Sequence, residues 1–261
     1  MKGKAILKKI GIRIIAAALL LSQPMQMVYA EEENNPEATQ EAADANPEAK
    51  TEEQIAAEEA AKKQASYDTP ADTNGLENWP TGPNVYAASA IVMDIDSGAV
   101  LYGKQIDEKR YPASITKLLT VLVALENANL TDKITFTDEC LNFLEWDDAN
   151  IGMRAGEEIT LEEALYGVLL ASANEVSYAV AKNVGENLGI GYDGFIELMN
   201  ERAQELGCKN SHWVNANGLH DENHYTTAYD MALIASAVYQ KEDFQRIEQT
   251  LEYKLGQTNL V

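Results

Sequence analysis

A serine and a lysine three residues apart are the strongest chemical signal in this sequence. Ser114 and Lys117 lie in residues 111–119, which read Tyr-Pro-Ala-Ser-Ile-Thr-Lys-Leu-Leu. Pro112 suits the first turn of a helix, and residues 115–125 continue as a buried apolar helix. Helical residues at i and i+3 share a face, so the Lys117 amine can reach the Ser114 hydroxyl. Apolar surroundings lower the pKa of the amine, and the pair therefore predicts a serine nucleophile with a lysine base.

A second group of polar residues favours this catalytic interpretation over a purely structural role for Ser114 and Lys117. Taken alone, Ser-x-x-Lys is also typical of an amphipathic helix whose lysine extends to solvent. Downstream, Ser172-Ala173-Asn174 interrupts the helix predicted for residues 161–171, before another helix begins. The break presents a hydroxyl and an amide at a junction between helices. Ser172 and Asn174 thus resemble the Ser-x-Asn motif of penicillin-recognising serine enzymes.

Two short strands begin the part of the chain that must position these residues. Residues 88–94 and 99–103 are rich in Val, Ile and Tyr and flank Asp96-Ser97-Gly98, which predicts a β-hairpin. Residues 133–137 form a further strand-like piece that is short and isolated. Because two strands alone are marginal, we expect an α+β architecture whose remaining strands follow residue 261.

The other predicted elements are helices with recognisable ends. Capping-box patterns occur at Thr160-x-x-Glu163, before the helix that leads to Ser172, and at Thr227-x-x-Asp230. The helix predicted to start at residue 195 should stop at Gly207, since glycine commonly follows a helix C-terminus.

The first thirty residues predict an export signal. Five cations, Lys2, Lys4, Lys8, Lys9 and Arg13, precede the apolar residues 14–21, and Val28-Tyr29-Ala30 supplies a signal-peptidase site. We expect cleavage after Ala30. An uncleaved membrane anchor is the less favoured alternative, because the apolar stretch is short for a bilayer span.

Residues 31–75 have the composition of a solvated tether. They contain thirteen acidic residues against three lysines and hardly any large apolar side chain, so they cannot bury a core. Within them, residues 51–64 could be transiently helical. The sequence therefore divides into a signal peptide (1–30), an acidic disordered tether (31–75) and a catalytic domain (76–261).

Composition excludes several classes of partner. The formal net charge of −22 makes nucleic-acid binding unfavourable. It would also repel an anionic membrane surface, so membrane attachment would need segments absent from this chain.

The cysteines and histidines give no sign of a metal site. Cys140 and Cys208 lack metal-site spacing; in an exported protein they could form a disulfide, but nothing in the sequence places them near each other. His220 and His224 lie in a predicted loop, where structural hydrogen bonding is favoured over metal binding. No cofactor motif is present.

From residue 85 to residue 251 the sequence resembles the serine-type D-alanyl-D-alanine carboxypeptidases. These are the low-molecular-weight penicillin-binding proteins of peptidase family S11. The likeness covers residues 89–102, the Pro-Ala-Ser-Ile-Thr-Lys core of residues 111–119, residues 167–181 and residues 215–232, which read Asn-Ala-Asn-Gly-Leu-His-Asp-Glu-Asn-His-Tyr-Thr-Thr-Ala-Tyr-Asp-Met-Ala. It implies an α+β fold of the DD-peptidase and β-lactamase type, with an antiparallel sheet packed against a mainly helical subdomain.

The resemblance also implies roles for the residues already singled out. Ser114 would attack the penultimate D-alanine carbonyl of a peptidoglycan stem peptide and form an acyl-enzyme, with Lys117 as general base. Ser172 would relay a proton to the leaving D-alanine, and Asn174 would bind either the substrate amide or the Lys117 amine. The Ser114 N–H would supply half of an oxyanion hole. No cofactor or metal is implied. β-Lactam antibiotics would be covalent inhibitors, and the enzyme would act in cell-wall biogenesis and cell shape outside the cytoplasmic membrane.

One departure from the family pattern keeps alternatives open. Members carry a third motif, Lys-Thr-Gly, on a strand that lines the cleft, and neither Lys-Thr-Gly nor Lys-Ser-Gly occurs in this sequence. We therefore expect that the chain is truncated at its C-terminus, and we do not expect this chain to turn over substrate. A non-catalytic cell-wall binding or sensor protein that retains the pocket is the main alternative. A class A β-lactamase is less favoured, because Glu197-Leu198-Met199-Asn200 is one residue short of the required Glu-x-x-Leu-Asn.

Overall fold

The predicted hairpin forms the centre of a small antiparallel sheet. The computed structural model describes residues 14–19 and 50–260, so the predicted cleavage site after Ala30 and the start of the tether lie outside the described residues. Strands β2 (Ser89–Asp94) and β3 (Val100–Lys104) pair antiparallel across a turn in which Gly98 has a φ of +70°. Glycine populates this left-handed region at no steric cost, and the prediction of a hairpin is confirmed.

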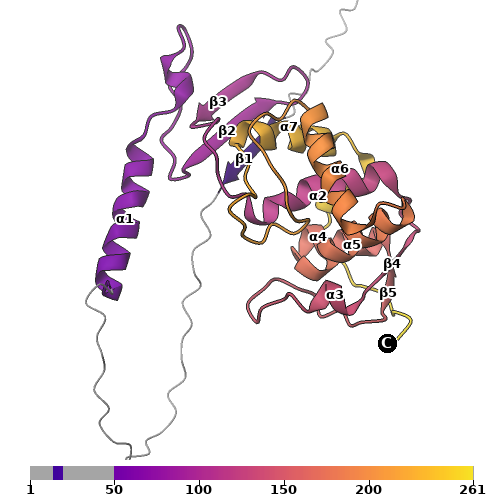
Figure 1. Ribbon diagram of the computed structural model, residues 1–261. Helices are drawn as coiled ribbons and strands as arrows, with labels where there is room; N and C mark the ends of the chain where they lie inside the picture. Colours follow the sequence, from indigo (N-terminus) through magenta and orange to yellow (C-terminus); the bar gives the residue numbers. More distant parts are fainter. Residues whose placement is uncertain (1–13, 20–49, 261) are drawn as a thin grey trace, which may run out of the picture.

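A third strand completes the described sheet. Strand β1 (Ile14–Leu19) pairs antiparallel with β2, from Ile14 opposite Asp94 to Leu19 opposite Ser89. We expected further strands to follow residue 261, whereas this strand precedes the hairpin (Figure 1). It consists of residues assigned above to the apolar core of a signal peptide, and that assignment stays a prediction.

The strand at residue 133 is not isolated, which corrects the prediction made for it. Strand β4 (Lys133–Thr135) pairs antiparallel with β5 (Glu158–Thr160), and Ile134 and Ile159 face each other and are buried. With three residues, β5 is too short to show an alternating pattern in the sequence.

A helical body makes up most of the described chain, with α2 (Lys117–Asn127) at its centre. Helix α2 contacts α4 (Leu161–Leu170), α5 (Asn174–Asn187), α6 (Gly191–Glu205) and α7 (Ala228–Tyr239). Burial around nearly the whole of α2 follows from its apolar sequence, as predicted. The sheet and this body together confirm the predicted α+β fold class (Figure 1).

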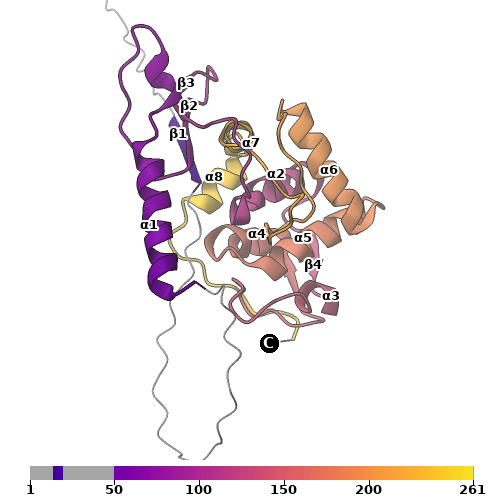
Figure 2. The ribbon, with the colours of Figure 1, turned by 60° about the vertical axis from the view of Figure 1, so that its left-hand side comes forward.

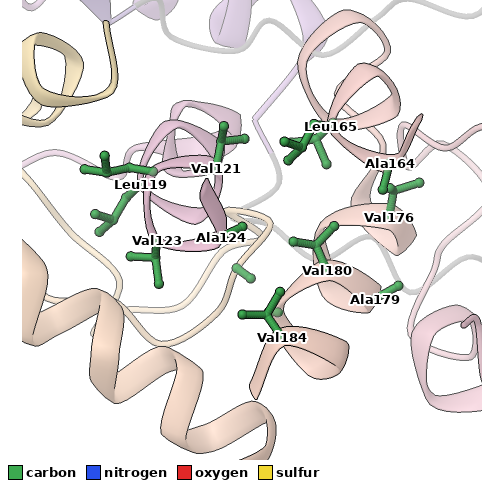
Figure 3. Close-up of a cluster of buried hydrophobic side chains, with 14 of the residues drawn as sticks. Leu119, Val121, Val123, Ala124, Ala164, Leu165, Val176, Ala179, Val180 and Val184 are labelled. Atoms are coloured by element: carbon green, nitrogen blue, oxygen red, sulfur yellow. The ribbon is translucent and has the colours of Figure 1, made fainter. Parts of the chain in front are cut away.

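Small aliphatic side chains fill the centre of this body. Figure 3 shows these side chains converging from α2, α4 and α5: Leu119, Val121, Val123, Ala124, Ala164, Leu165, Val176, Ala179, Val180 and Val184. Each is almost fully buried, so the helix that follows Ser114 is packed on several sides.

Helix α7 joins the sheet to the helical body. Ala228 and Ala232 of α7 pack against Ile91 and Met93 of β2 in a second apolar cluster. Two short helices, α3 (Asp138–Leu141) and α8 (Glu242–Glu248), lie at the periphery, with α8 against α4 and α7. The small alanine side chains allow α7 to lie close to the sheet.

The described part of the predicted tether is folded. Helix α1 (Glu52–Asp68) starts at a capping box formed by Thr51 and Gln54, and none of its residues is buried. It runs along one side of the molecule (Figure 2). A sequence rich in Ala, Glu and Lys has high helix propensity without an apolar face, which explains a helix that packs so little. The division of the chain at residues 30 and 75 stays a prediction.

Hydrogen bonds attach the C-terminal end of α1 and the segment that follows it to the hairpin. The buried Lys104 amine of β3 donates to the backbone carbonyls of Ser66 and Val85, the second at 2.7 Å. Trp79 Nε1 donates to the Leu101 carbonyl at 3.0 Å. The hydrogen bond between Lys104 and Ser66 crosses the boundary predicted at residue 75.

The predicted helix ends are mostly confirmed. Thr160 and Glu163 form both hydrogen bonds of a capping box, and Gly207 follows α6 with a φ of +92°. At α7 the Thr227 hydroxyl accepts from the Asp230 N–H, but the Asp230 carboxylate accepts from residues 209–211 instead of completing the box. Among the described residues, no helix has the length and apolar character needed to cross a bilayer.

Candidate active site

The turn that carries Ser114 is a short 3-10 helix, where the sequence predicted the first turn of an α-helix. This turn, η2 (Ala113–Thr116), follows Pro112 and passes into α2 at Lys117. A 3-10 helix has three residues per turn, so side chains at i and i+3 eclipse each other. The Lys117 Nζ atom accordingly lies 3.1 Å from the Ser114 Oγ atom.

The Lys117 amine is buried and fully hydrogen-bonded. Its side chain is almost inaccessible, with the residue 3% exposed, whereas Ser114 is exposed. Besides Ser114 Oγ, Nζ donates to Asn174 Oδ1 at 2.8 Å and to the Asn217 carbonyl at 2.7 Å. These three acceptors match the three N–H groups of an ammonium, so the amine is fixed in direction.

Burial changes the acidity of this amine. Desolvation lowers the pKa of Lys117 from 10.5 to about 8, although the nearby carboxylates of Asp148 and Glu175 act to raise it. The direction predicted from the sequence is therefore confirmed. A pKa near 8 leaves part of the amine neutral at physiological pH, which a general base requires.

The second motif lies at the junction between α4 and α5, as predicted. Asn174 is buried as the first residue of α5, and its N–H donates to the Ala149 carbonyl at 2.8 Å. Ser172 has a φ of +55°, a left-handed conformation that is uncommon for serine. Within the described part of the chain its hydroxyl makes no hydrogen bond to Ser114 or Lys117. The structure thus joins Ser114, Lys117 and Asn174 directly, whereas Ser172 shares only the junction with Asn174.

Two further residues of this site were not singled out by the sequence. Asn217 binds the Lys117 amine through its backbone carbonyl, so the type of its side chain does not indicate this contact in the sequence. Glu175 is fully buried, and its Oε1 accepts from the Ile151 N–H at 2.7 Å, while Oε2 has no partner among the described residues. Burial raises the pKa of this carboxyl. Glu175 holds the loop around residues 148–153 beside the junction.

The histidines and cysteines considered as possible metal or disulfide residues differ in burial and in their contacts. His224 is buried with both ring nitrogens in hydrogen bonds, to Thr116 and Val214, as the prediction of structural hydrogen bonding requires. His220 is exposed and packs edge-on against Tyr111, with ring centroids 4.6 Å apart. Cys140 and Cys208 are free thiols, and burial raises the pKa of Cys208 to about 12.

An α+β scaffold in which the buried lysine of a Ser-x-x-Lys pair lies beside a Ser-x-Asn junction is the arrangement of penicillin-recognising serine enzymes. The D-alanyl-D-alanine carboxypeptidase family, peptidase S11, matches residues 77–260. The chain belongs to this family, and the resemblance inferred from its motifs is confirmed.

Individual relatives agree with this assignment. D-alanyl-D-alanine carboxypeptidase DacF of Bacillus subtilis is 34% identical over 171 residues, which cover 64% of this chain and 42% of that protein. DacA of Haemophilus influenzae is 31% identical over 163 residues, covering 60% of this chain and 40% of that protein. The chain therefore spans about two-fifths of the length of these curated relatives.

Solved structures show the same fold. The Streptomyces K15 DD-transpeptidase superposes with a TM-score of 0.60 at 28% identity, covering 64% of this chain and 66% of that chain. Penicillin binding protein 5 from Haemophilus influenzae superposes with a TM-score of 0.56 at 30% identity, covering 62% and 47%. The fold is thus that of the DD-peptidases.

Proposed function

We propose that this chain carries the nucleophile of a serine-type D-Ala-D-Ala carboxypeptidase. The enzyme removes the terminal D-alanine from peptidoglycan stem peptides through an acyl-enzyme on Ser114, and β-lactam antibiotics acylate the same residue. One observation carries the proposal: a buried amine of lowered pKa lies 3.1 Å from an exposed serine hydroxyl. Such a pair activates serine without a histidine.

Acylation begins at the Lys117 amine. In its neutral form the amine takes the proton of the Ser114 hydroxyl as Oγ bonds to the carbonyl carbon of the penultimate D-alanine. The Ser114 N–H donates to the developing oxyanion. Collapse of the tetrahedral intermediate breaks the peptide bond and leaves an ester on Ser114.

Departure of D-alanine requires the proton to reach its nitrogen. We assign this transfer to Lys117 acting through the Ser172 hydroxyl, because Ser172 lies on the junction that also supplies Asn174. Asn174 Oδ1 accepts from the Lys117 amine, which leaves the Asn174 Nδ2 group to bind a substrate carbonyl. Water then attacks the ester, and Lys117 again serves as base, which restores the free serine.

A non-catalytic binding or sensor protein is the second candidate, because no Lys-Thr-Gly sequence is present. Family membership favours the carboxypeptidase over a class A β-lactamase. Glu197, the glutamate considered for the latter, is exposed on α6.

Release of D-alanine from a synthetic stem pentapeptide by the full-length protein tests the proposed activity. We expect release by the wild type and none by Ser114→Ala. A wild type that binds the peptide without releasing D-alanine would support the sensor instead.

We further propose that the protein is exported and acts on the outer side of the cytoplasmic membrane. The cationic start, the apolar stretch and the Val-Tyr-Ala site support this location, as does a substrate found in the cell wall. N-terminal sequencing of the exported protein should give Glu31 as its first residue. An intact Met1 or Lys2 terminus on exported protein would contradict cleavage.

A further inference from the structure

A buried histidine reaches the turn that carries the nucleophile. His224 is 1% exposed and lies in the loop before α7, and its Nε2 atom is 2.8 Å from the Thr116 hydroxyl oxygen. Its Nδ1 atom accepts from the Val214 N–H at 3.2 Å. A neutral imidazole has one N–H, so acceptance at Nδ1 puts the proton on Nε2. His224 therefore donates to Thr116.

Thr116 in turn hydrogen-bonds to Ala113, the residue before Ser114. It is fully buried, and its hydroxyl donates to the Ala113 carbonyl at 2.8 Å. Ala113 has a φ of +49°, in the left-handed region that sterically disfavours alanine. A conformation of this kind persists only where its surroundings determine it, and the hydrogen bond from Thr116 is one such determinant.

The same loop contacts this turn a second time. A Cβ atom added to Gly218 would lie 1.9 Å from the Ala113 carbonyl oxygen, so only glycine permits this approach. The preceding residue, Asn217, supplies the carbonyl that binds Lys117. The loop of residues 215–224 thus contacts both the turn before the nucleophile and the base.

The imidazole remains neutral in this setting. Burial lowers the pKa of His224 from 6.5 to about 4; Asp221 acts to raise it, and His212 acts to lower it further. Trp213 packs edge-on against the ring, with centroids 5.3 Å apart. The donor direction from His224 to Thr116 is therefore kept over the physiological pH range.

We propose that His224 and Thr116 are positioning residues for Ser114. Their hydrogen-bond chain runs from His224 Nε2–H to the Thr116 hydroxyl and from there to the Ala113 carbonyl. It holds Ala113 in the left-handed conformation that directs Ser114 toward the Lys117 amine. The inference rests on the proposed function and adds to it a role for two residues that do not touch substrate.

Nuclear magnetic resonance of the 261-residue chain tests the geometry without any catalytic readout. We expect His224 as the neutral Nε2–H tautomer at pH 7, and Ala113 carbon shifts typical of a left-handed residue. In Thr116→Val, which removes the hydroxyl with little change of volume, the Ala113 shifts should move, whereas Thr116→Ser should retain them. An Nδ1–H tautomer, or unchanged Ala113 shifts in Thr116→Val, would overturn the proposal.

Acylation of the full-length protein by a reporter penicillin tests the consequence for Ser114. Loss of a buried hydrogen bond predicts acylation slowed by about tenfold or more in Thr116→Val, and near wild-type rates in Thr116→Ser. Equal rates in the two variants would refute a positioning role. If the wild type is not acylated while the resonance results hold, the proposed function fails and the hydrogen-bond chain stands.

Discussion

In the proposed mechanism, the chemistry at Ser114 depends on the protonation state of one buried amine, that of Lys117. Desolvation holds the pKa of Lys117 near 8, and only the neutral amine can accept the serine proton. Below this pH the amine is mostly charged, and above it mostly neutral.

We predict that acylation by a reporter penicillin accelerates with rising pH and levels off above about pH 8, the value set by Lys117. Stopped-flow fluorescence between pH 6 and pH 9.5 measures the profile on the full-length protein. A rate that stays constant or falls across this range would exclude Lys117 as the base.

Replacing Lys117 with arginine should separate charge from basicity. A guanidinium keeps the positive charge but cannot lose its proton near neutral pH, so Lys117→Arg should slow acylation by about a hundredfold or more. The melting temperature of the variant checks that it folds.

Lys182→Arg is the matched control for this substitution. Lys182 lies on α5 and pairs with Glu139 and Glu186, away from Ser114, so the control should keep the wild-type rate. Wild-type acylation in Lys117→Arg would mean that the base is another residue.

The sequence predicted the pairing of Ser114 with Lys117 and the nearby Asn174, but not the other groups around them. Ser114 and Lys117 are three residues apart, so helical spacing alone brought them together. His224 reaches Thr116 and Asn217 reaches the Lys117 amine from a loop far along the chain, and the Glu175 carboxylate acts on the pKa of Lys117 from α5. Their contacts depend on tertiary packing, and a backbone carbonyl such as that of Asn217 has no residue-specific pattern at all.

At the scale of the elements, the junction between α4 and α5 depends on a buried carboxyl. Glu175 accepts from the Ile151 N–H, which ties the loop beside the site to the start of α5. The backbone of Asn174 is bonded to the same loop through Ala149. The position of the Asn174 amide is therefore coupled to that of the loop.

Glu175→Ala should lower the free energy of unfolding by about 1–3 kcal/mol, because it leaves the Ile151 N–H without its acceptor. Urea denaturation followed by circular dichroism measures this change. Glu175→Gln keeps an acceptor at the same place and should lose less. If the two variants have equal stability, the hydrogen bond to Ile151 does not hold the loop.

Elements with local signals were predicted well, and elements without them were not. The cap at Thr160 and the glycine stop at Gly207 depend on hydrogen bonds within a few residues, which the sequence displays directly. Strand β5 depends on pairing with a segment about 25 residues away, and its three residues carry no pattern of their own. Helix α1 lacks an apolar face, and the sequence indicated only transient helicity for residues 51–64.

At the scale of the whole molecule, strand β1 and the predicted signal peptide use the same residues. If export removes residues 1–30, the β2 edge that β1 occupies loses its partner. An unpaired strand edge favours pairing with another segment of the chain or with another molecule. The helical core around α2 consists of residues outside the sheet, so its packing does not require β1.

The central claim is that Ser114 is the nucleophile and that the enzyme forms an acyl-enzyme there. Peptide mapping by mass spectrometry, after brief incubation of the full-length protein with a reporter penicillin, tests this most directly. Trypsin cleavage at Arg110 and Lys117 isolates residues 111–117, which contain Ser114 as the single serine. We predict one penicilloyl group on this peptide in the wild type and none in Ser114→Ala. Labelling of a different peptide, or undiminished labelling of Ser114→Ala, would contradict the assignment.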